Sequence, residues 1–516
     1  MIRSFLTVSS GTLASRLLGF LRDSMIAALL GAGPVADAFL VAFQLVNVAR
    51  RLLSEGALNA ALVPAWLRLR ETDRSAAASF AGRVLGTISA TLIAITALIG
   101  VLMPLVITVL APGFTGQETL RLAVDNARLM LPYLAFAGPS TVLLALASAQ
   151  GRFFLTAFSP LLFNIVLIAA MVVLISAHRD AGFVAPTLAA TVGVAGLLQV
   201  SILALSWGEP IATPLRVSFD REMRGFFTRA IPGMVASSAP QLLIVAGAII
   251  ASSSPSAVSW LYFANRLIEL PLGIVGVAMG TVLIPELTRA LHGDDKSAIT
   301  NAESRAMELA VGLALPATLG LIALNEPIVR LLFQHGAFTA DDTQSTSDAL
   351  VWLALGLPAH VLVKALSPAF FAREDTYAPL TAMLKGFVIA IVVAVLLGHF
   401  FGASGIAAAI ACGAWSNALW LIRRGSATFG FSLDEAARRR LPLIAAAALL
   451  MGGPLWLAAD LTMGAFTHGL AQAAILLGLI GSAIAVYGGL LALLDVVGWR
   501  EVVNAVGRGR TGDLRP

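Results

Sequence analysis

The sequence predicts an all-α polytopic membrane protein with about 14 transmembrane helices. Hydrophobic residues make up 58% of the 516 residues, and charged residues make up only 12%, whereas soluble proteins have about 25% charged residues. The mean hydropathy is +0.88. Apolar runs of about 20 residues, long enough to cross a bilayer, follow one another along the chain. Little of the chain is left for a soluble domain.

Each expected spanning helix is a mostly apolar run that polar or charged residues bound. Fourteen runs fit this description, and charged residues interrupt the first, second, eighth and tenth of them. The expected spans are 8–30, 35–65, 84–110, 122–149, 155–177, 184–206, 226–251, 257–287, 304–324, 346–371, 378–398, 405–422, 441–460 and 470–497.

The placement of Lys and Arg predicts the orientation of these helices. An even number of helices puts both termini on one side, which we take as the cytoplasm. Of the 34 Lys and Arg residues, 23 then lie in cytoplasmic segments, four in outer loops and seven within the membrane. This asymmetry follows the positive-inside rule and predicts cytoplasmic termini. Basic loops beside anionic headgroups account for the charge, so we expect no nucleic-acid partner.

The chain repeats itself weakly at an offset of 221 to 224 residues. Six helices per repeat keep both copies in the same orientation, so we expect two parallel six-helix lobes related by a pseudo-twofold axis along the membrane normal. The last two helices lie outside the repeat. The recurring segments are APGFTGQET (111–119) with HGAFTADDT (335–343), Leu62-Val63-Pro64 with Leu283-Ile284-Pro285, and Arg152 with Arg373.

This repeat predicts the domain organisation. A basic cytoplasmic segment follows each lobe. The first segment links the two lobes, and the second leads to the last two helices. The expected parts are a first lobe (1–207), a cytoplasmic linker (208–229), a second lobe (230–424), a cytoplasmic loop (425–440), and the last two helices with a cytoplasmic tail (441–516).

The stretch 15–64 contains seven charged residues in an apolar setting. A charge at membrane depth costs roughly 2.5–3.5 kcal/mol on insertion scales, and such residues usually face a bundle interior or a wet cavity. We interpret the stretch as two membrane helices that line a hydrated, net-cationic cavity. The charged residues are Arg16, Arg22, Asp23, Asp37, Arg50, Arg51 and Glu55.

Ion pairing without any ligand is the alternative interpretation. Arg51 and Glu55 are four residues apart, and Arg16 and Asp23 are seven apart, so each pair shares a helix face. These two pairs could simply neutralise each other.

Arg22 and Arg50 are left without an obvious helical partner, and Asp37 could neutralise only one of them. This surplus of positive charge favours an anionic ligand. A guanidinium group binds phosphate oxygens in pairs and stays charged at physiological pH. A pyrophosphate would satisfy two or three such groups together.

The second lobe also contains charges within predicted helices. Arg266 and Glu269 are three residues apart and could pair on one helix face. Pro271 breaks the backbone bonding nearby and frees a carbonyl group in or near the cavity. Lys364 lies within the tenth predicted helix, where a substrate role and a structural role are equally open. Lys385 is expected to reach the headgroups from near a helix end.

The sequence indicates no catalytic or metal chemistry. Cys412 is the one cysteine, which excludes an internal disulfide and a cysteine-based metal cluster. The six histidines are scattered without zinc-ligand spacing, and the chain lacks the G-x-x-x-x-G-K-[ST] phosphate loop. We therefore expect a protein that is not an enzyme and that needs no cofactor.

Several of these segments together resemble the signature of the MurJ (MviN-type) lipid II flippases, within the multidrug/oligosaccharidyl-lipid/polysaccharide flippase superfamily. The resemblance runs over the whole chain. The matching segments are SRLLGFLRD (15–23), GAGPVADAFLVAF (31–43), RRLLSEGALNAALVP (50–64), Val258–Pro271, Gly273–Pro285, GAFT (336–339) and VKALSPAFFARED (363–375).

The resemblance implies two six-helix lobes that form a V, with two extra helices whose groove holds a lipid tail. It implies transport of undecaprenyl-pyrophosphate-linked disaccharide–pentapeptide (lipid II) across the bacterial inner membrane by alternating access. Lipid II and membrane lipids are then the expected partners of a monomer, with cell-wall synthases as further candidates. Positions that match the family's essential cationic residues are Arg16, Arg22, Arg50 and Arg266, and its acidic positions are Asp23, Asp37 and Glu55.

This chain departs from the family pattern in two places. Val46 precedes Asn47 where relatives commonly have proline, and Asn265 precedes Arg266 where many have an acidic residue. The seventh helix has no acid and the eleventh offers Lys385, so we expect no sodium site of the type that some relatives have.

Three other functions remain as alternatives. A flippase for another polyprenyl-linked glycan would share the pyrophosphate. A multidrug or cation antiporter of the same superfamily predicts unpaired acids, whereas arginines outnumber acids here. A scaffold for cell-wall synthases would need no buried charges.

Overall fold

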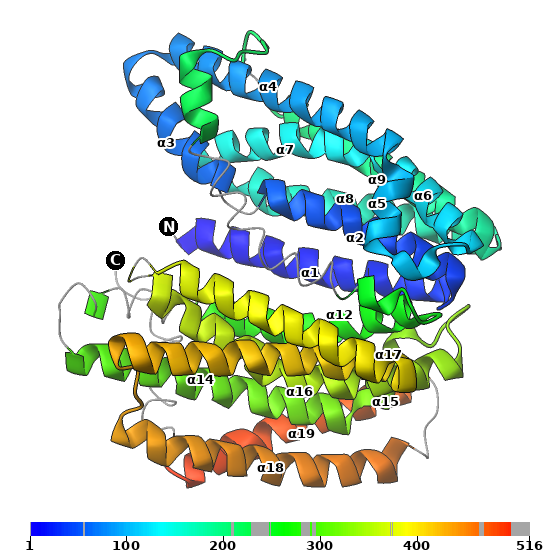
Figure 1. Ribbon diagram of the computed structural model, residues 1–516, viewed down its shortest axis with the longest axis vertical. Helices are drawn as coiled ribbons and strands as arrows, with labels where there is room; N and C mark the ends of the chain where they lie inside the picture. The colour runs from blue at the N-terminus through cyan, green and yellow to red at the C-terminus, as the bar shows by residue number, and fades with distance from the viewer. Residues whose placement is uncertain are drawn as a thin grey trace. The chain divides into compact units, whose positions relative to one another are not determined.

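The computed structural model describes residues 2–54, 57–207, 211–228, 247, 249–279, 289–290, 296–371, 373, 375–463 and 469–496. These residues form α-helices and one short 3-10 helix, without strands. In the part of the chain that is described, nine helical stretches are long and apolar enough to cross a membrane. The predicted all-α membrane fold is confirmed, while the total of fourteen helices stays a prediction (Figure 1).

The chain divides into two compact units. The first consists of Met1–Trp260 with Phe333–Thr339, and the second consists of Leu261–Leu332 with Ala340–Pro516.

In the first unit, long helices pack side by side as neighbours of a bundle (Figure 1). α1 packs on α8, α2 packs on α6, and α7 lies between α4 and α9. The described helices are α1 (Ile2–Leu30), α2 (Pro34–Ser54), α3 (Ala57–Thr72), α4 (Arg74–Val101), α5 (Met103–Leu110), α6 (Glu118–Met130), α7 (Pro132–Ala149), α8 (Phe153–Ser176) and α9 (Ala181–Leu205), with the 3-10 helix η1 (Pro112–Phe114).

Three of the expected helices are divided in the structure. The span 35–65 falls on α2 and α3. The span 84–110 falls on α4 and α5, and Pro104 stands in the first turn of α5, where its missing N–H group is tolerated. The span 122–149 falls on α6 and α7, and α7 begins at a proline in the same way. The expected helix 226–251 lies mostly outside the described residues.

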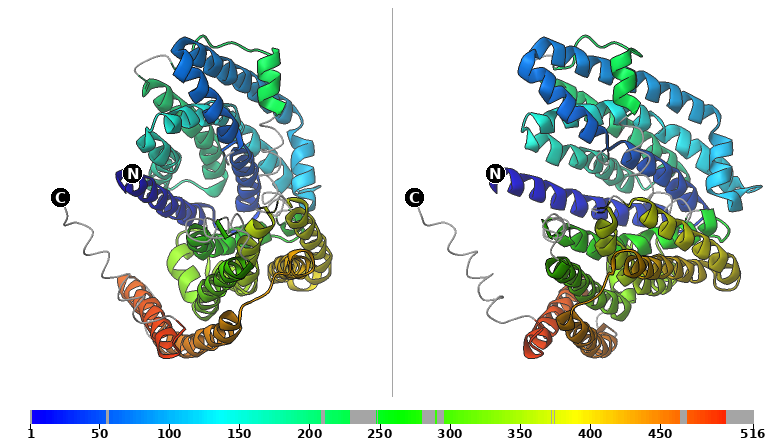
Figure 2. Two further views of the ribbon diagram at one scale, coloured as in Figure 1. Left: turned by 90° about the vertical axis from the view of Figure 1, so that its left-hand side faces the viewer. Right: turned by 60° about the vertical axis from the view of Figure 1, so that its left-hand side comes forward.

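In the second unit, α14 is the central helix: α16, α18 and α19 pack against it, and α17 packs on α16 (Figure 2). Gly402, with φ of 52°, interrupts α17, so the two expected helices 378–398 and 405–422 are its two halves. The described helices are α12 (Ala257–Ala278), which begins in the first unit, α14 (Lys296–Ala323), α15 (Asn325–Phe333), α16 (Ala340–Phe371), α17 (Tyr377–Phe429), α18 (Glu435–Met463) and α19 (Leu470–Leu493).

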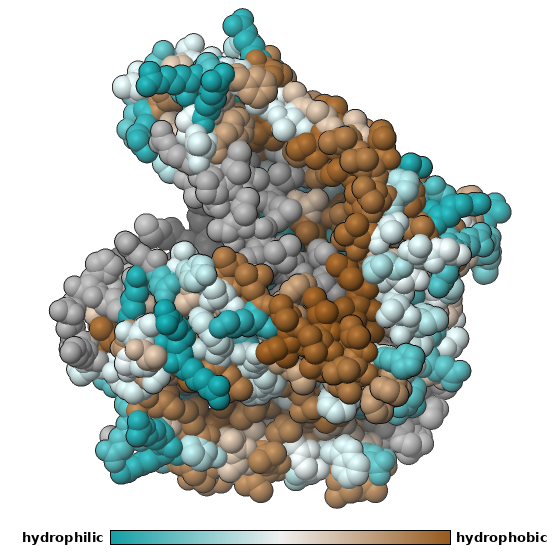
Figure 3. Space-filling view, in the orientation of Figure 1, coloured by the Kyte–Doolittle hydropathy of each residue, from teal (hydrophilic) through white to brown (hydrophobic). Residues whose placement is uncertain are grey.

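Hydrophobic side chains cover the outer faces of these helices. Figure 3 shows them gathered over α4 and over the middle of α17, with hydrophilic residues toward the helix ends. On α4, Leu98 is 59% exposed and Val101 is 75% exposed. Such faces suit contact with lipid, because they would cost free energy in water.

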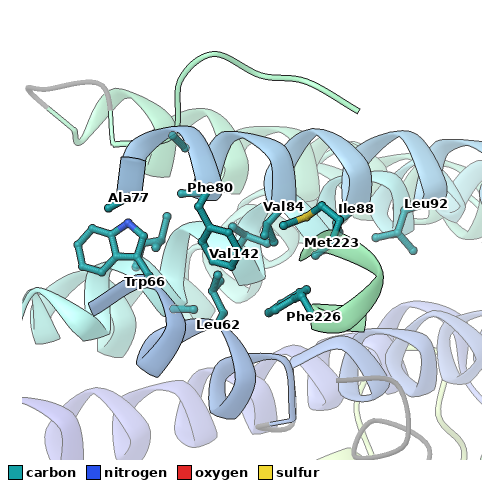
Figure 4. Close-up of a cluster of buried hydrophobic side chains, with 14 residues drawn as sticks. Leu62, Trp66, Ala77, Phe80, Val84, Ile88, Leu92, Val142, Met223 and Phe226 are labelled. Carbon is teal, nitrogen blue, oxygen red and sulfur yellow. The ribbon is translucent and has the colours of Figure 1, made fainter. Parts of the chain in front are cut away.

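Residues 211–228, which we call the linker segment, dock on α4 in the first unit. Met223 and Phe226 lie in a buried cluster with side chains of α3, α4 and α7 (Figure 4). Arg83 of α4 binds Asp220 Oδ2 through Nη1 and Glu222 Oε2 through Nη2, each at 2.7 Å. Apolar burial and a two-carboxylate ion pair therefore hold the segment.

Each unit contains an arginine that stacks on an aromatic ring, which we call an arginine latch. The Arg152 guanidinium lies 4.5 Å from the Trp207 ring centroid, and Arg373 lies 3.8 Å from that of Phe429. Arg152 and Arg373 are a predicted repeat pair. The sequence separation of their aromatic partners, Trp207 and Phe429, differs by only one residue from the separation of the two arginines. The two latches make the same contact at matching places.

Candidate functional site

The site begins with a buried charged cluster between α1 and α8. Arg22 is 7% exposed and Asp23 is fully buried. Asp23 Oδ1 accepts hydrogen bonds from Arg22 Nε at 2.9 Å and from Arg22 Nη2 at 2.6 Å. Arg22 Nη1 donates to Asn164 Oδ1 at 2.9 Å, and Asn164 Nδ2 donates to the Ser15 carbonyl at 3.2 Å. The cluster thus fixes the arginine between two helices.

Aromatic rings cover this arginine and bring a second one beside it. The Arg22 guanidinium lies 5.0 Å from the Phe43 ring centroid and 5.9 Å from that of Phe163. The Arg50 guanidinium lies 6.0 Å from the same Phe163 ring. Tyr133 packs edge-on against Phe163 with centroids 5.2 Å apart. Phe163 is therefore shared by two arginines from α1 and α2.

Three hydrogen bonds leave part of the Arg22 guanidinium available. Of its five N–H groups, the contacts with Asp23 and Asn164 use one on each of the three nitrogens. Two N–H groups, one on each Nη, make no further hydrogen bond to the described residues. Together with the half-buried Arg50, these groups are hydrogen-bond donors of the kind that bind anions in other proteins.

The expected pairing of these charges is corrected at Arg22. Arg22 was expected to have no helical partner, but it pairs with the adjacent Asp23 because its long side chain folds back. Asp37 was considered able to neutralise one arginine at most, and its Oδ1 accepts from Ser259 N at 2.9 Å and from Ser259 Oγ at 2.5 Å. Asp37 lies 13 residues before Arg50 on α2, about 20 Å along the helix.

The other predicted residues of the first unit fall at its edges. Arg16 is exposed on α1, and Arg51 is half-buried at the end of α2. Glu55 lies outside the described residues, so its predicted pairing with Arg51 stays a prediction.

The Asp37 contact belongs to a set that we call the turn contacts, because they gather around the turn between α1 and α2. The Ala337 N–H group donates to the Ala28 carbonyl at 2.8 Å. Gly31 and Gly336 both have positive φ, and a Cβ on Gly31 would lie 2.5 Å from the Ala337 carbonyl oxygen. Only glycine permits this approach without strain. Within the first unit, the α1–α2 turn is thus joined to the segment before α16.

In the second unit, the predicted pairing of Arg266 with Glu269 is confirmed. Arg266 Nη1 and Glu269 Oε2 lie 2.6 Å apart. Asn265 Nδ2 donates to Glu269 Oε1 at 3.5 Å, so Asn265 supports the acid instead of adding charge. Lys364 is exposed on α16, and its Nζ lies 3.5 Å from where a Cβ on Gly276 of α12 would stand. Lys364 lies within α16, as expected, seven residues before its end.

Asn164 and Phe163 were not predicted as site residues. Both lie in α8, which reads as an ordinary apolar span. The one available signal was the single amide of Asn164 within that apolar run, because a buried polar group needs a partner. Over the described part of the chain, no group of three or more His, Cys, Asp or Glu side chains could hold a metal ion.

Comparison with known proteins adds a further line of evidence. The family model described as lipid II flippase MurJ matches residues 26–476. A probable lipid II flippase MurJ of Rhizobium meliloti is 36% identical over 94% of this chain and 92% of its own length. A lipid II flippase MurJ of Burkholderia cenocepacia is 30% identical over 82% of this chain and 83% of its own length.

Solved structures share the fold. A lipid II flippase MurJ in an inward closed conformation superposes with a TM-score of 0.79 at 22% identity, over 96% of this chain and all of that one. An inward-facing multidrug resistance MATE family transporter of the MOP superfamily superposes with a TM-score of 0.67 at 16% identity, over 83% of this chain and 95% of that one.

Proposed function

The chain belongs to the lipid II flippase MurJ family, and from this membership we propose that it moves lipid II from the inner to the outer leaflet of the bacterial inner membrane. The observation that supports substrate binding is the pair of arginines, Arg22 and Arg50, over one Phe163 ring. Their N–H groups are suited to the two phosphates of the headgroup.

The remaining charged residues have supporting roles in this proposal. Asp23 positions Arg22, and Glu269 positions Arg266 in the second unit. Arg16, Arg51 and Lys364 add positive charge that attracts the anionic headgroup. Glu55 is proposed to balance Arg51.

Transport would proceed by alternating access of the headgroup cavity to the two sides of the membrane. The turn contacts, which join Ala28 to Ala337 and Asp37 to Ser259, would lie toward the outer side of the membrane, form when that side is closed and break when it opens. Their small residues and few hydrogen bonds support such reversibility. The protein itself would form no covalent bond with the substrate.

The lipid tail would lie along α18 and α19. Between Leu441 and Leu491 the only acid is Asp460, and Lys and Arg are absent. Leu449 is 64% exposed and Leu477 is 69% exposed. If photo-crosslinkers on the polyprenyl chain labelled only the two lobes, this assignment would be wrong.

Complementation tests the function directly. Cells depleted of their own lipid II flippase would receive this chain, and lipid II at the outer leaflet would be measured. We expect growth and outer-leaflet lipid II to return with the wild-type chain. Normal membrane abundance without either would contradict the proposal. Restored export of a different polyprenyl-pyrophosphate glycan would instead identify another substrate.

A further inference from the structure

A cationic and aromatic cluster lies on the surface of α17 in the second unit. Lys385 Nζ lies 4.6 Å from the centroid of the Trp420 ring. The two residues stand on opposite sides of the Gly402 break, one on each half of α17. Arg424 follows Trp420 by four residues and therefore lies on the same helix face. Lys385 and Arg424 are both exposed.

A close backbone approach fixes this arrangement. A Cβ on Gly386 would lie 2.6 Å from the Gly413 carbonyl oxygen, and a Cβ on Gly413 would lie 2.6 Å from the Gly386 carbonyl oxygen. The two halves of α17 therefore approach closely at these two glycines, where a side chain on either residue would overlap the backbone of the other. Lys385 stands next to this contact and is held beside Trp420.

The positive charge of the cluster has no carboxylate to neutralise it among the described residues, where no Asp or Glu oxygen lies within 4.0 Å of Lys385 or Arg424. Such carboxylates accompany Arg83, Arg266 and Arg373. The surroundings are apolar instead. The neighbouring exposed side chains are Leu380 (42%), Leu384 (45%), Val388 (57%) and Leu419 (47%).

The position of the cluster along the helices indicates its depth in the membrane. Lys385 lies seven residues after the expected start of its spanning helix at 378, about 10 Å along the axis. A lysine stem can lie along apolar surface while its ammonium group reaches the headgroups. Trp and Tyr favour the same interface, and Tyr377 is 73% exposed at the start of α17.

We propose that Lys385, Trp420 and Arg424 form a binding site for the phosphate group of an anionic phospholipid in the cytoplasmic leaflet. The ammonium group and the guanidinium fork would bind the phosphate oxygens, while Trp420 holds Lys385 in place and contacts the glycerol region. Basic pockets between membrane helices on the cytoplasmic side bind such headgroups. The proposal rests on the orientation in which both termini are cytoplasmic.

Lipid binding to the purified full-length protein tests the site. Native mass spectrometry would measure the dissociation constant of the first bound phosphatidylglycerol, with phosphatidylcholine as the zwitterionic comparison. Removing both charges in K385A/R424A should weaken phosphatidylglycerol binding about thirtyfold, and either single change about fivefold. Phosphatidylcholine binding should not change. Lys385→Arg should retain binding, because it keeps the charge.

A matched control separates a built site from general attraction. Arg438 is an exposed arginine near the start of α18, so Arg438→Ala removes one cytoplasmic charge and should leave phosphatidylglycerol affinity within about twofold. Equal affinity of the wild type for both lipids would overturn the proposal. Equal losses in Arg438→Ala and Lys385→Ala would also overturn it, as would wild-type affinity in K385A/R424A.

Discussion

Arg22 and Arg50 share the Phe163 ring but differ in burial. Arg22 is almost fully buried and bonds to Asp23, which has no solvent exposure at all. Arg50 is half-buried at the other end of the cluster. Removing one member of a buried ion pair costs roughly 3–5 kcal/mol, because it leaves an uncompensated charge. The two arginines should therefore respond differently to substitution.

We expect Arg22→Ala to lower the amount of protein in the membrane, and Asp23→Asn in the same chain to restore part of it. Arg50→Ala should keep normal abundance but lose flipping, because a ligand contact is removed. Immunoblots beside complementation measure both. Arg70→Ala is the control, since Arg70 also stacks on an aromatic ring, Trp66, but lies away from the cluster. Normal abundance of Arg22→Ala would refute the structural role of the pair.

Lysine provides a second test of the ligand role at the same positions. Arg50→Lys keeps the charge but loses the paired hydrogen bonds. We expect defective complementation at normal abundance. Near-normal function in Arg50→Lys would indicate that Arg50 only balances charge.

The two arginine latches should also differ in how much they contribute to the stability of the fold. Arg373 Nη2 binds Glu303, which is 5% exposed, at 3.1 Å, whereas Arg152 binds the Ser206 carbonyl through Nη1. Replacing Arg152 by alanine should lower the free energy of unfolding by about 1 kcal/mol, the usual cation–π contribution. Replacing Arg373 by alanine should lower the free energy of unfolding by roughly 3 kcal/mol, the lower end of the range for a broken buried ion pair. The lower end applies because the Arg373 side chain is 22% exposed.

Thermal unfolding of the purified variants measures this difference. Arg373→Ala should lower the unfolding midpoint clearly more than Arg152→Ala. Glu303→Gln added to Arg373→Ala should recover part of the loss, because no buried charge is then stranded. Equal midpoints for the two single variants would show that the Glu303 pair adds nothing.

The charges of the site could be predicted from the sequence, but their partners could not. Spacing rules consider residues three or four apart on a helix, and adjacent residues such as Arg22 and Asp23 do not face each other by that rule. The Asn164 contact joins residues 142 apart in sequence. It depends on how α1 meets α8, which no local pattern encodes. The pairing within α12, by contrast, follows from local helical spacing alone.

At the scale of elements, the linker segment is a docked part of the first unit and not only a connector. Its backbone passes close to α4: a Cβ on Gly86 would lie 2.7 Å from the Arg216 carbonyl oxygen. Thr87 Oγ1 donates to the Ser218 carbonyl at 3.3 Å and accepts from the Ser218 N–H group at 3.0 Å. Its basic composition was visible in the sequence, and a cytoplasmic location was predicted from it, but these backbone and hydrogen-bond contacts join residues 130 or more apart in sequence.

A larger residue at Gly86 should displace the segment. We expect Gly86→Val to expose residues 211–220 to limited proteolysis, because the added carbon atoms would overlap the linker backbone. Gly320→Val is the matched control, since no atom lies within 4 Å of a Cβ at that helical glycine. Equal proteolysis of both variants and the wild type would show that α4 does not hold the segment.

The docking should also depend on pH. Hydrogen bonds from the Met223 N–H group and the Ser218 hydroxyl lower the pKa of Asp220 from 3.8 to about 2. A lowered pKa stabilises the docked state above the ordinary pKa, and that stability is lost as pH falls through about 2. The protection of the Ser218 amide, which is its exchange rate relative to an unstructured chain at the same pH, should therefore be constant at pH 5 and above.

Replacing the titrating group mimics its protonation. Asp220→Asn should speed exchange at Ser218 already at neutral pH, since it weakens the Arg83 pair and the Met223 contact. Unchanged exchange at Ser218 in Asp220→Asn would show that docking of the linker segment does not depend on this carboxylate.

For the whole molecule, composition predicted the helical membrane fold because apolar runs must pair their backbone groups internally. It did not predict every helix break. Prolines at the starts of α5 and α7 divide two expected spans, whereas the break at Gly402 in α17 falls between two expected spans, as the sequence predicted. Hydropathy windows average over such single residues.

The orientation predicts which loops a membrane-impermeant reagent reaches. In a Cys412→Ala background, single cysteines that replace Thr115, Ser254 or Thr339 should react with the reagent from outside the cell. Cysteines at Arg70 and Ser432 should react only after the membrane is opened. Labelling of position 70 from outside would contradict the fourteen-helix arrangement and both cytoplasmic termini.

The matched latches also bear on ancestry and engineering. If one six-helix ancestor was duplicated, the arginine and its aromatic ring were present before the copies diverged, whereas the further partners of the two arginines, Glu303 and the Ser206 carbonyl, differ between the copies. Each half would then have inherited its own arginine latch. The two halves could be expressed as separate polypeptides, cut within the expected cytoplasmic linker (208–229), and each should insert with its latch formed.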